Sequence, residues 1–432
     1  MAAAAERPTE DQAIELLDVL DGFFRVAKRS ATLDGSVPLR AAQACTPLLE
    51  GNSVGVELVL GPRIEVARGR LGLSIVRSKA VSNVETQGRA VMPALEAQRV
   101  VSAPFAKQFS TSPFTVQRGR LRIFTGLFAR VPANLRLRIS STANRRSRAF
   151  TITESIVEAG SSLCPIVLEL TPAELDGPIV VEGDIATLLP LPARVQTAYC
   201  PLAQAEPAAQ AHLDFYDRAY FQAKESGPTK KYRTLVARSE RLESASQDSS
   251  STIVEGGPRQ LEIQPDRIVA RAALDFSFRY DGSDLEVRCD PIELEELANK
   301  IRATWAPVFD AARAREPFRG ALLYLTKYFT PHPRGEPHFF VKPPALVVTP
   351  PGWSTVIDGT RTAAFDVLRG VVETDVFHAV PLVFSVAIMG KEHRVRRGDF
   401  LAELFTAPRH VLETPVRVTT LSAWPTPSEG PS

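Results

Sequence analysis

A run of arginines without acidic residues is the part of this sequence that most directly suggests chemistry. No Asp or Glu occurs between Ala97 and Thr153, and that window contains Arg118, Arg120, Arg122, Arg130, Arg136, Arg138, Arg145, Arg146 and Arg148. Guanidinium groups bind phosphate and carboxylate oxygens through paired hydrogen bonds, so Arg136, Arg138 and Arg145 are candidates for an anion-binding surface. The alternative is that these arginines alternate with apolar residues on half-exposed strands and pair with distant acids. We favour this alternative, because arginine stems commonly cover apolar surface.

Two further groups of residues have the types found in active sites but not the spacing. Tyr328, His332, His338 and His378 could share one site, yet they match no metal-binding spacing, and two of the histidines lie in a Pro-rich stretch. Gly51-Asn52-Ser53-Val54-Gly55 fits the pattern of a hydrolase nucleophile, but that motif must lead from a strand into a helix. The alternating run that follows predicts a strand instead. We therefore expect no metal site and a simple turn at residues 51–55.

Composition and charge favour a globular protein of the cytoplasm. Hydrophobic residues make up 44% and charged residues 23% of the 432 residues, which is ordinary for such proteins. No apolar run reaches the length of a membrane span, and the first residues lack the pattern of a secretory signal. The scattered cysteines, Cys45, Cys164, Cys200 and Cys289, form no paired motif, which fits a reducing compartment. The net charge of +2 gives no general reason to expect a nucleic acid partner.

Two stretches of the chain share the same sequence punctuation, and this predicts a tandem repeat. Ile156-Val157-Glu158 is followed by Gly183-Asp184, and Val371-Val372-Glu373 is followed by Gly398-Asp399. The Glu-to-Gly spacing is 25 residues in both stretches. A weaker echo relates residues 62–68 to residues 265–271. Because self-similarity over so long a period indicates duplicated domains and not a solenoid, we expect two copies of one β-rich unit.

The expected secondary structure is mainly β, with a helix at the N-terminus and helical connectors. Apolar residues from Ile14 to Phe24 recur at helical spacing, and short alternating runs after Gly51 predict strands of a barrel or sandwich. The predicted domains are 1–50 (helix and lead-in), 51–203 (first β-domain), 204–260 (helical connector and Ser-rich linker), 261–423 (second β-domain, with an inserted helix at 291–304) and 424–432 (disordered tail).

The second copy resembles the trimeric dUTPases and dCTP deaminases. The segment Gly370-Val371-Val372-Glu373-Thr374-Asp375, an apolar strand at 382–388, and Gly398-Asp399-Phe400-Leu401-Ala402-Glu403-Leu404 are similar to their Gly-Val-Ile-Asp-x-Asp-Tyr and Gly-Asp-Arg-Ile-Ala-Gln-Leu segments. The resemblance covers about residues 340–410 and, more faintly, 115–192. It implies two dUTPase-like β-barrel (β-clip) domains and self-association. Pro350-Pro351-Gly352-Trp353 with Glu373-Thr374-Asp375 also resembles a bacterial family without an established activity.

The resemblance implies a water-activating carboxylate, and Glu373 occupies that position. Other parts of the family site are missing: Val376 stands where an aromatic ring should stack on deoxyribose, the Arg-Ser-Gly phosphate loop is absent near Pro350, and no glycine-rich C-terminal arm follows. In the first copy, Glu158 is followed by Ala159 in place of a second acid. An alternative interpretation is that both glutamates fix a hairpin by binding backbone N–H groups or an arginine.

Two hypotheses on function follow. In the first, the chain is a non-catalytic binding or assembly protein with protein partners or self-association, no cofactor, and Trp353 as a candidate interaction residue. In the second, it is a deoxynucleotide-handling hydrolase with remodelled loops, in which Glu373 and Asp375 activate water with Mg²⁺ and Arg397 binds phosphate. We favour the first hypothesis, because most of the family's catalytic parts are missing from the sequence.

Overall fold

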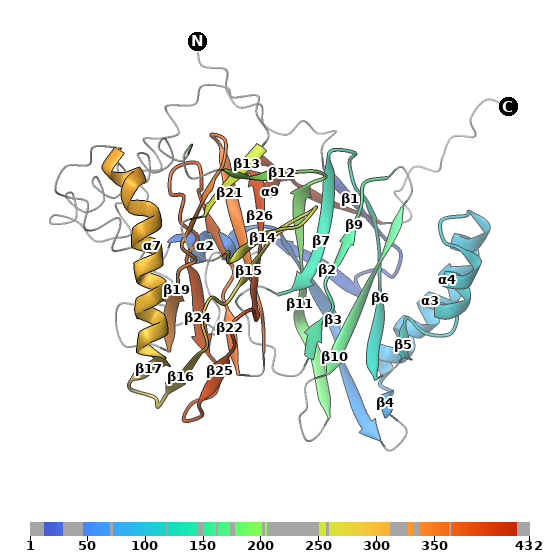
Figure 1. Cartoon of the computed structure of the whole chain (residues 1–432). Helices are drawn as coiled ribbons and strands as arrows, with labels where there is room; N and C mark the ends of the chain where they lie inside the picture. The colour runs from blue at the N-terminus through green and yellow to red at the C-terminus, as the bar shows by residue number, and fades with distance from the viewer. Residues whose placement is uncertain are drawn as a thin grey trace, which may run out of the picture. The chain divides into compact units, whose positions relative to one another are not determined.

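The structure is a computed structural model, and it is mainly β (Figure 1). It describes residues 13–28, 46–69, 72–117, 119–142, 144, 150–160, 163–172, 178–200, 204, 250–255, 259–311, 327–331, 337–362 and 364–420. No helix in these ranges is long and apolar enough to cross a membrane.

The chain forms two compact units, and each is built from segments that are not consecutive in sequence. Unit 1 comprises Met1–Arg29, Val54–Ala193 and His410–Ser432, whereas unit 2 comprises Ser30–Ser53 and Arg194–Arg409. The division therefore differs from the sequence-based one, which placed consecutive domains at 51–203 and 261–423. The predicted lead-in, 1–50, is divided between the two units at Ser30. The end of the predicted second domain, from His410 on, belongs to unit 1.

Unit 1 contains two sheets and two helices, and its strands pair antiparallel except for β27, which is parallel to β1. One sheet has the order β27-β1-β6-β10-β8 with β5 on β6, and the other has the order β2-β3-β11-β7-β9 with β4 on β3. Their bounds are β1 (Ile14–Asp18), β2 (Phe24–Lys28), β3 (Val56–Gly69), β4 (Gly72–Ile75), β5 (Phe114–Gln117), β6 (Arg120–Arg130), β7 (Leu135–Ser141), β8 (Phe150–Ile152), β9 (Ser155–Val157), β10 (Cys164–Pro172), β11 (Ile179–Pro192) and β27 (Val416–Thr420), with helices α3 (Lys79–Ala97) and α4 (Ala103–Phe109).

Unit 2 distributes its strands over four sheets. Their orders are β12-β13-β20, β14-β15-β26-β21-β23, β17-β16-β25 and β18-β19-β24-β22. The bounds are β12 (Gln196–Cys200), β13 (Ser250–Glu255), β14 (Leu261–Ile263), β15 (Ile268–Arg271), β16 (Phe276–Tyr280), β17 (Leu285–Cys289), β18 (Phe329–Pro331), β19 (His338–Val341), β20 (Ala345–Val348), β21 (Trp353–Gly359), β22 (Phe365–Val367), β23 (Gly370–Val372), β24 (Leu382–Val386), β25 (His393–Val395) and β26 (Phe400–Pro408), with helices α2 (Thr46–Ser53), α7 (Pro291–Ala311) and α9 (Arg409–Leu412), of which the last begins in unit 2 and ends in unit 1.

Each unit has its own hydrophobic core. In unit 1, buried residues of both sheets form one cluster, for example Leu16 of β1, Phe124 of β6 and Leu58 of β3. In unit 2 the cluster is centred on aromatic rings, with Phe339 stacked on Phe384 at a centroid distance of 4.8 Å. Because each core is closed by residues of its own unit, burial of apolar surface stabilises each unit separately.

The strand orders of the two units match. The order β2-β3-β11-β7-β9 of unit 1 recurs as β14-β15-β26-β21-β23 in unit 2, and β5-β6-β10-β8 recurs as β18-β19-β24-β22. The members of each matching pair also follow one another in the same sequence order. Chance would rarely reproduce both the order of the strands and their succession along the chain.

The residue registers of matching strands also agree. In unit 1, Leu137 of β7 lies opposite Val157 of β9, and in unit 2, Thr355 of β21 lies opposite Val372 of β23. Across the next pair, Pro192 lies opposite Leu135, and Pro408 lies opposite Trp353. We refer to two residues that occupy the same register position as equivalent. By this definition Glu158 is equivalent to Glu373, since each directly follows its strand.

The predicted N-terminal helix is wrong, because the segment forms strands β1 and β2. β1 pairs with β27 on one side and β6 on the other, so four of its five residues are buried and its sequence carries an almost continuous apolar run. Such a run cannot be distinguished from a helix by periodicity alone. The signal that was overlooked is Asp21-Gly22, which turns the chain with positive φ angles of 36° and 75° and is typical of a hairpin.

Other predicted elements have mixed outcomes. A helix is present where one was predicted at 291–304, as part of α7. The C-terminal part of the predicted Ser-rich linker is instead strand β13, whose Ser251 is fully buried. A strand tolerates serine there because its hydroxyl is hydrogen-bonded to Thr406 at 3.0 Å. The predicted helical connector at 205–225 and the tail at 424–432 lie outside the described residues. No sheet in the described part of the chain closes into a barrel.

Candidate functional site: an arginine-bound acidic cluster

The Pro350-Pro351-Gly352-Trp353 segment forms a tight turn at the start of β21. The Trp353 N–H donates to the Pro350 carbonyl at 3.2 Å, and Gly352 has a φ of 79°. A proline in the second position and a residue with positive φ in the third are typical of a type II turn. The turn presents both backbone groups of Gly352 to the neighbouring segments.

Arg409 joins this turn to the acidic segment that follows β23. Its guanidinium donates to both carboxylate oxygens of Asp375, at 2.9 and 2.7 Å, and to the Trp353 carbonyl at 3.1 Å. It also lies 3.4 Å from a carboxylate oxygen of Glu373. The backbone N–H of Gly352 donates to Asp375 at 2.8 Å, and that of Arg409 donates to the Gly352 carbonyl at 2.8 Å. We refer to Gly352, Trp353, Glu373, Asp375 and Arg409 as the acidic cluster.

The carboxylates of the acidic cluster are buried and bound by Arg409. The exposed fractions of the side chains are 9% for Glu373, 7% for Asp375 and 23% for Arg409. A bidentate guanidinium–carboxylate pair fixes both partners. Because Arg409 places a fixed positive charge against both acids, this donor set does not fit a Mg²⁺ ion. Among the described residues, no group of three or more His, Cys, Asp or Glu is arranged to hold a metal.

A buried hydroxyl network supports the acidic segment from beneath. The Thr374 hydroxyl is hydrogen-bonded to those of Thr349, at 2.9 Å, and Thr355, at 2.8 Å. The Thr374 carbonyl is bonded to His378 Nδ1 at 2.6 Å. Burial lowers the pKa of His378, and this opposes protonation of the ring. These bonds fix the direction of the chain between Glu373 and Asp375.

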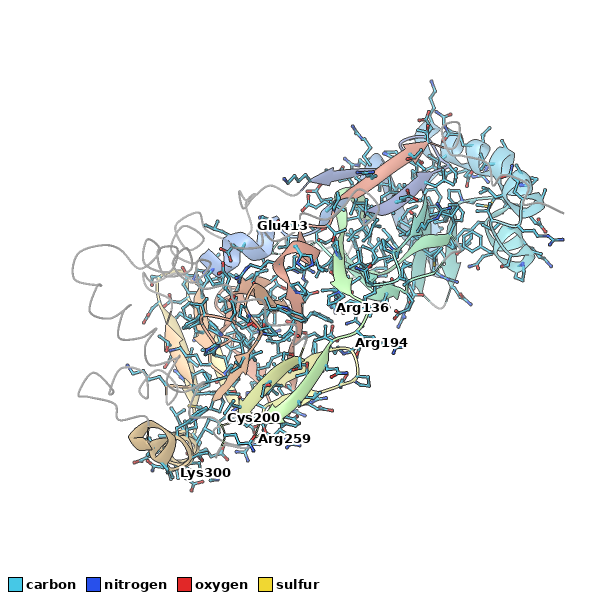
Figure 2. All side chains as sticks on the ribbon, turned by 90° about the horizontal axis from the view of Figure 1, so that it is seen from above. Arg136, Arg194, Cys200, Arg259, Lys300 and Glu413 are labelled. Atoms are coloured by element: carbon cyan, nitrogen blue, oxygen red, sulfur yellow. The ribbon has the colours of Figure 1, made fainter. Side chains whose placement is uncertain are left out.

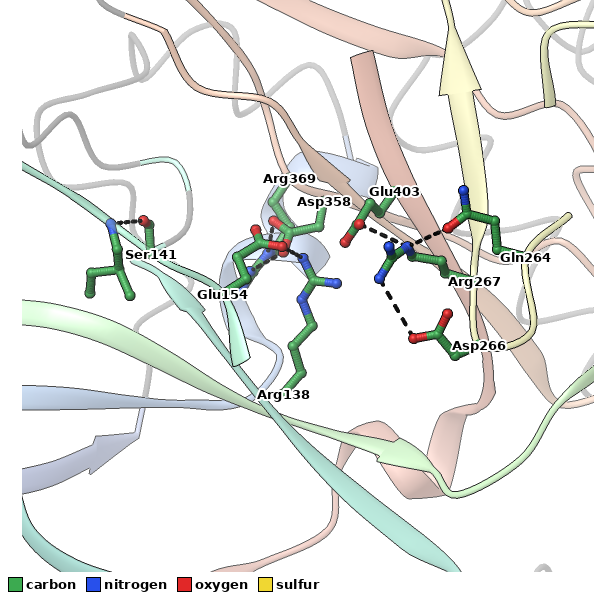
Figure 3. A network of polar contacts seen from close by, with 10 residues as sticks. Arg138, Ser141, Glu154, Gln264, Asp266, Arg267, Asp358, Arg369 and Glu403 are labelled. Atoms are coloured by element: carbon green, nitrogen blue, oxygen red, sulfur yellow. Dashed lines mark hydrogen bonds and ion pairs between the residues drawn. The ribbon is translucent and has the colours of Figure 1, made fainter. Parts of the chain in front are cut away.

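A second buried ion pair lies in unit 2, within the same five-stranded sheet. Arg369, directly before β23, donates to both oxygens of Asp358 on β21, at 3.1 and 2.9 Å (Figure 3). The side chains are 0% and 4% exposed. On the same sheet, Arg267 binds Glu403 of β26 and Gln264, both at 3.0 Å. The polar groups inside this sheet therefore act as partners for one another.

The structure describes three of the four predicted anion-binding arginines: Arg136, Arg138 and Arg397. Arg136 and Arg138 are buried on β7, with exposed fractions of 4% and 2%, and Arg138 pairs with Glu154 at 2.6 Å (Figures 2 and 3). Arg145 lies outside the described residues. Arg397 is exposed in unit 2 and pairs with Glu293 at the start of α7, at 2.9 Å. Arg138 therefore pairs with an acid, as the alternative interpretation expected of the arginines between residues 97 and 153.

The other residues that the sequence suggested for a site have structural roles wherever the structure describes them. Tyr328 is buried, its hydroxyl accepts from the Ala273 N–H at 2.9 Å, and burial raises its pKa. His338 is buried on β19, and His332 lies outside the described residues. Trp353 is half-buried in the cluster described above. Residues 51–53 end helix α2, which precedes a strand, so the order is opposite to that of a nucleophile motif.

The three cysteines that the structure describes carry no sign of a reactive thiol. Cys164, Cys200 and Cys289 are free thiols in the described part of the chain. Burial is the main cause that raises the pKa of each of the three. Because the thiolate is the nucleophilic form, a raised pKa disfavours reactivity. Cys45 lies outside the described residues.

Of the acidic cluster, unit 1 keeps only a glutamate, Glu158, at the equivalent positions. Glu158 is exposed and is followed by Ala159 and Gly160. The backbone bond from Arg409 to Gly352 has an equivalent from Ala193 to the Asn134 carbonyl, at 2.9 Å. The position of Arg409 is therefore occupied by an alanine, and the same backbone frame holds no charged cluster.

Sequence analysis missed Arg409, Asp358 and Arg369. The signal for the last two is a charged residue directly beside apolar strand residues, as in Val356-Ile357-Asp358 and Arg369-Gly370-Val371. A charge in such a position is costly unless it is paired. Arg409 carries no such signal, because its partners are defined only when β26 lies beside β21.

Comparison with known proteins gives only distant structural likenesses. No family model matches the chain, and no curated protein matches it. Among solved structures, the chain is similar to the 2′-deoxycytidine 5′-triphosphate deaminase from Agrobacterium tumefaciens, with a TM-score of 0.28 and 8% sequence identity, over 92% of this chain and 98% of that chain. A likeness at this score carries no argument about activity.

Proposed function

We propose that this chain is a non-catalytic binding or assembly protein built on a duplicated dUTPase-like scaffold. The observation that carries the proposal is the engagement of Asp375 and Glu373 by Arg409. A general base must reach the proton that it removes, within hydrogen-bond distance of the substrate or of one water. Here both oxygens of Asp375 already accept from Arg409, and Glu373 is 9% exposed.

The duplication is supported by the matching strand orders and registers of the two units. A functional site retained after duplication would be expected in at least one unit in a form open to ligands. Unit 1 has an exposed Glu158 with no second acid, and unit 2 has two acids that one arginine engages. What the units share is the backbone frame, which favours a role of the scaffold in binding or assembly.

The test uses equivalent glutamates as variant and control. Replacing Glu373 with Gln should lower the free energy of unfolding by about 1–3 kcal/mol, because a buried acceptor of Arg409 is weakened. Replacing the exposed Glu158 with Gln should change it by less than about 0.5 kcal/mol. Both are measured by urea unfolding, and native mass spectrometry checks that the assembly state is unchanged.

A nucleotide screen distinguishes this proposal from the hydrolase alternative. The purified chain is heated with deoxynucleotides and ribonucleotides, with and without Mg²⁺, and any release of pyrophosphate or ammonia is measured. We expect no thermal shift and no turnover, whereas a ligand at about a hundredfold its Kd would add roughly 3 kcal/mol. Turnover that the Glu373→Gln variant loses while remaining folded would overturn the proposal.

A further inference from the structure

Strands β12 and β27 occupy equivalent places but in opposite units. β12 follows β11, the last long strand of unit 1, yet it pairs with β13 in unit 2. β27 follows β26, the equivalent strand of unit 2, yet it pairs with β1 in unit 1. Both pairings are parallel, and both strands lie at the edge of their sheet.

The registers show that these two strands are equivalent. Glu15 of β1 lies opposite Arg130 on one side and Arg417 of β27 on the other. Thr252 of β13 lies opposite Val348 on one side and Ala198 of β12 on the other. The positions before the strands agree as well, since Pro192 and Pro408 are equivalent across their neighbours. Unit 2 therefore carries β12, which chain order would assign to unit 1. Unit 1 carries β27, which chain order would assign to unit 2.

We infer that the two halves of the polypeptide exchange edge strands reciprocally, with β1 and β13 as strand-binding edges and the segments 196–200 and 416–420 as their ligands. An extended segment added to a sheet edge gains a ladder of backbone hydrogen bonds. It also covers an edge that would otherwise be open to other chains. The two halves of the polypeptide then bind each other through these strands, independently of the covalent link between them.

The contacts around β12 fit a dedicated binding site. The Thr197 hydroxyl is bonded to Ser251 at 2.8 Å. The Tyr199 hydroxyl donates to the Leu261 carbonyl at 2.9 Å and accepts from the Ile263 N–H at 3.1 Å, so it satisfies backbone groups of β14. The Arg259 guanidinium lies 4.3 Å from the centre of the Tyr199 ring, near the end of β12 that Cys200 marks in Figure 2.

Helix α2 is a second segment of the N-terminal half of the chain that belongs to unit 2. It precedes strand β3 of unit 1 but packs on β23 of unit 2. A Cβ atom at Gly51 would lie 2.6 Å from the Gly370 Cα, so glycine is needed at that contact. The N-terminal half of the chain therefore supplies α2 and β12 to unit 2, and the C-terminal half supplies β27 to unit 1. Reciprocal exchange requires that each half of the chain contribute a segment in this way.

The first experiment traps the strand register with disulfides in the full chain. With the four native cysteines replaced by serine, the exchanged arrangement places position 15 opposite 417 and position 198 opposite 252. The unexchanged arrangement would instead pair 15 with 198 and 252 with 417. We expect Glu15→Cys with Arg417→Cys, and Ala198→Cys with Thr252→Cys, to form disulfides within one polypeptide, since facing strand residues meet the distance requirement. The matched controls, Glu15→Cys with Ala198→Cys and Thr252→Cys with Arg417→Cys, should not.

Disulfides in the control pairs would overturn the inference. So would a link between positions 15 and 417 of two different polypeptides, because the strand would then serve a second copy. These outcomes do not depend on nucleotide binding, so they are distinguishable from a failure of the proposed function.

The second experiment cuts the chain and asks whether the halves remain together. A protease site is inserted between residues 205 and 245, and the purified protein is cleaved without denaturant. We expect the two fragments to co-elute as a 1:1 complex and to separate only when the protein unfolds. Fragments that separate as two folded monomers would overturn the inference, and this result decides the matter even where a cysteine variant fails to fold.

Discussion

Units 1 and 2 each place an ion pair between two matching strands, but with opposite charge order. In unit 1 the arginine, Arg138, is on strand β7 and the acid, Glu154, directly precedes β9. In unit 2 the acid, Asp358, is on the equivalent strand β21 and the arginine, Arg369, directly precedes β23. Glu154 and Arg369 are equivalent by register, whereas Asp358 lies two residues further along its strand than the equivalent of Arg138. The position before the last strand of the sheet thus carries a paired charge in both units, but of opposite sign.

The two ion pairs differ in burial, and this gives the largest predicted effect. Replacing Asp358 with Asn removes a buried carboxylate from a guanidinium of 0% exposure, which should cost about 3–5 kcal/mol of unfolding free energy. Replacing Glu154 with Gln also takes an acid from a buried guanidinium, but that acid is 47% exposed, so water screens the pair and the loss should be smaller. Urea unfolding of both variants measures the difference. Equal losses would show that burial does not govern these pairs.

A second equivalent pair contrasts a lysine with a phenylalanine. In unit 2 the Lys342 N–H donates to the carbonyl of Tyr328, the residue before β18. In unit 1 the Phe124 N–H donates to the carbonyl of Pro113, the residue before the matching strand β5. Phe124 is fully buried in the core of unit 1. Lys342 is 7% exposed, and burial, with a smaller contribution from Lys327, lowers its pKa to about 8. Unit 2 therefore keeps a costly amine where unit 1 keeps a ring.

This cost predicts a pH dependence. The unfolded chain holds the lysine proton up to its ordinary pKa of 10.5, whereas the folded chain releases it near pH 8. Between these values the unfolded state binds more protons, so stability rises with pH. The shift corresponds to about 3 kcal/mol, present as a penalty below pH 8 and relieved as pH rises.

The Lys342→Met variant should therefore be more stable near pH 7 and should lose the rise. Urea unfolding from about pH 7 to about pH 10 compares the two proteins. The Lys327→Met variant serves as the control, since it removes the smaller cause and should reduce the rise without abolishing it. A wild-type profile that is parallel to that of Lys342→Met would contradict the lowered pKa.

The mainly β fold and the positions of its turns could be predicted from the sequence. Gly183 and Gly398, which mark the two matching stretches, both have positive φ angles, 69° and 86°. That conformation favours glycine, both at the bulge that Gly183 forms within β11 and at the turn that Gly398 forms before β26. The weaker echo does not match the register, however: Val56 lies opposite Leu188 and Ile268 lies opposite the equivalent residue, Leu404, which makes Val56, and not Ile64, the equivalent of Ile268.

The candidate site was only partly predictable. Glu373 and Asp375 could be singled out by position, and the alternative that an arginine binds such acids was stated. The identity of that arginine depends on which strands are neighbours, because Arg409 is 34 residues from Asp375 in sequence. The exchange of β12 and β27 could not be predicted at all, since local pattern is the same whichever sheet an edge strand joins.

The two exchanged strands differ in how their side chains are held, and this gives the smallest predicted effect. Tyr199 of β12 is bonded through its hydroxyl to two backbone groups of β14, whereas the equivalent residue of β27, Val418, is 46% exposed. Replacing Tyr199 with Phe removes those bonds and should cost about 1 kcal/mol. Replacing Val418 with Ala should cost less than about 0.5 kcal/mol. Hydrogen exchange of the β13 and β1 amides measures each effect at its own edge. Loss of protection at β13 in the Tyr199→Phe protein, with β1 unchanged, would show that β12 is held by its side chains. An unchanged β13 edge would mean that the backbone ladder suffices for both strands.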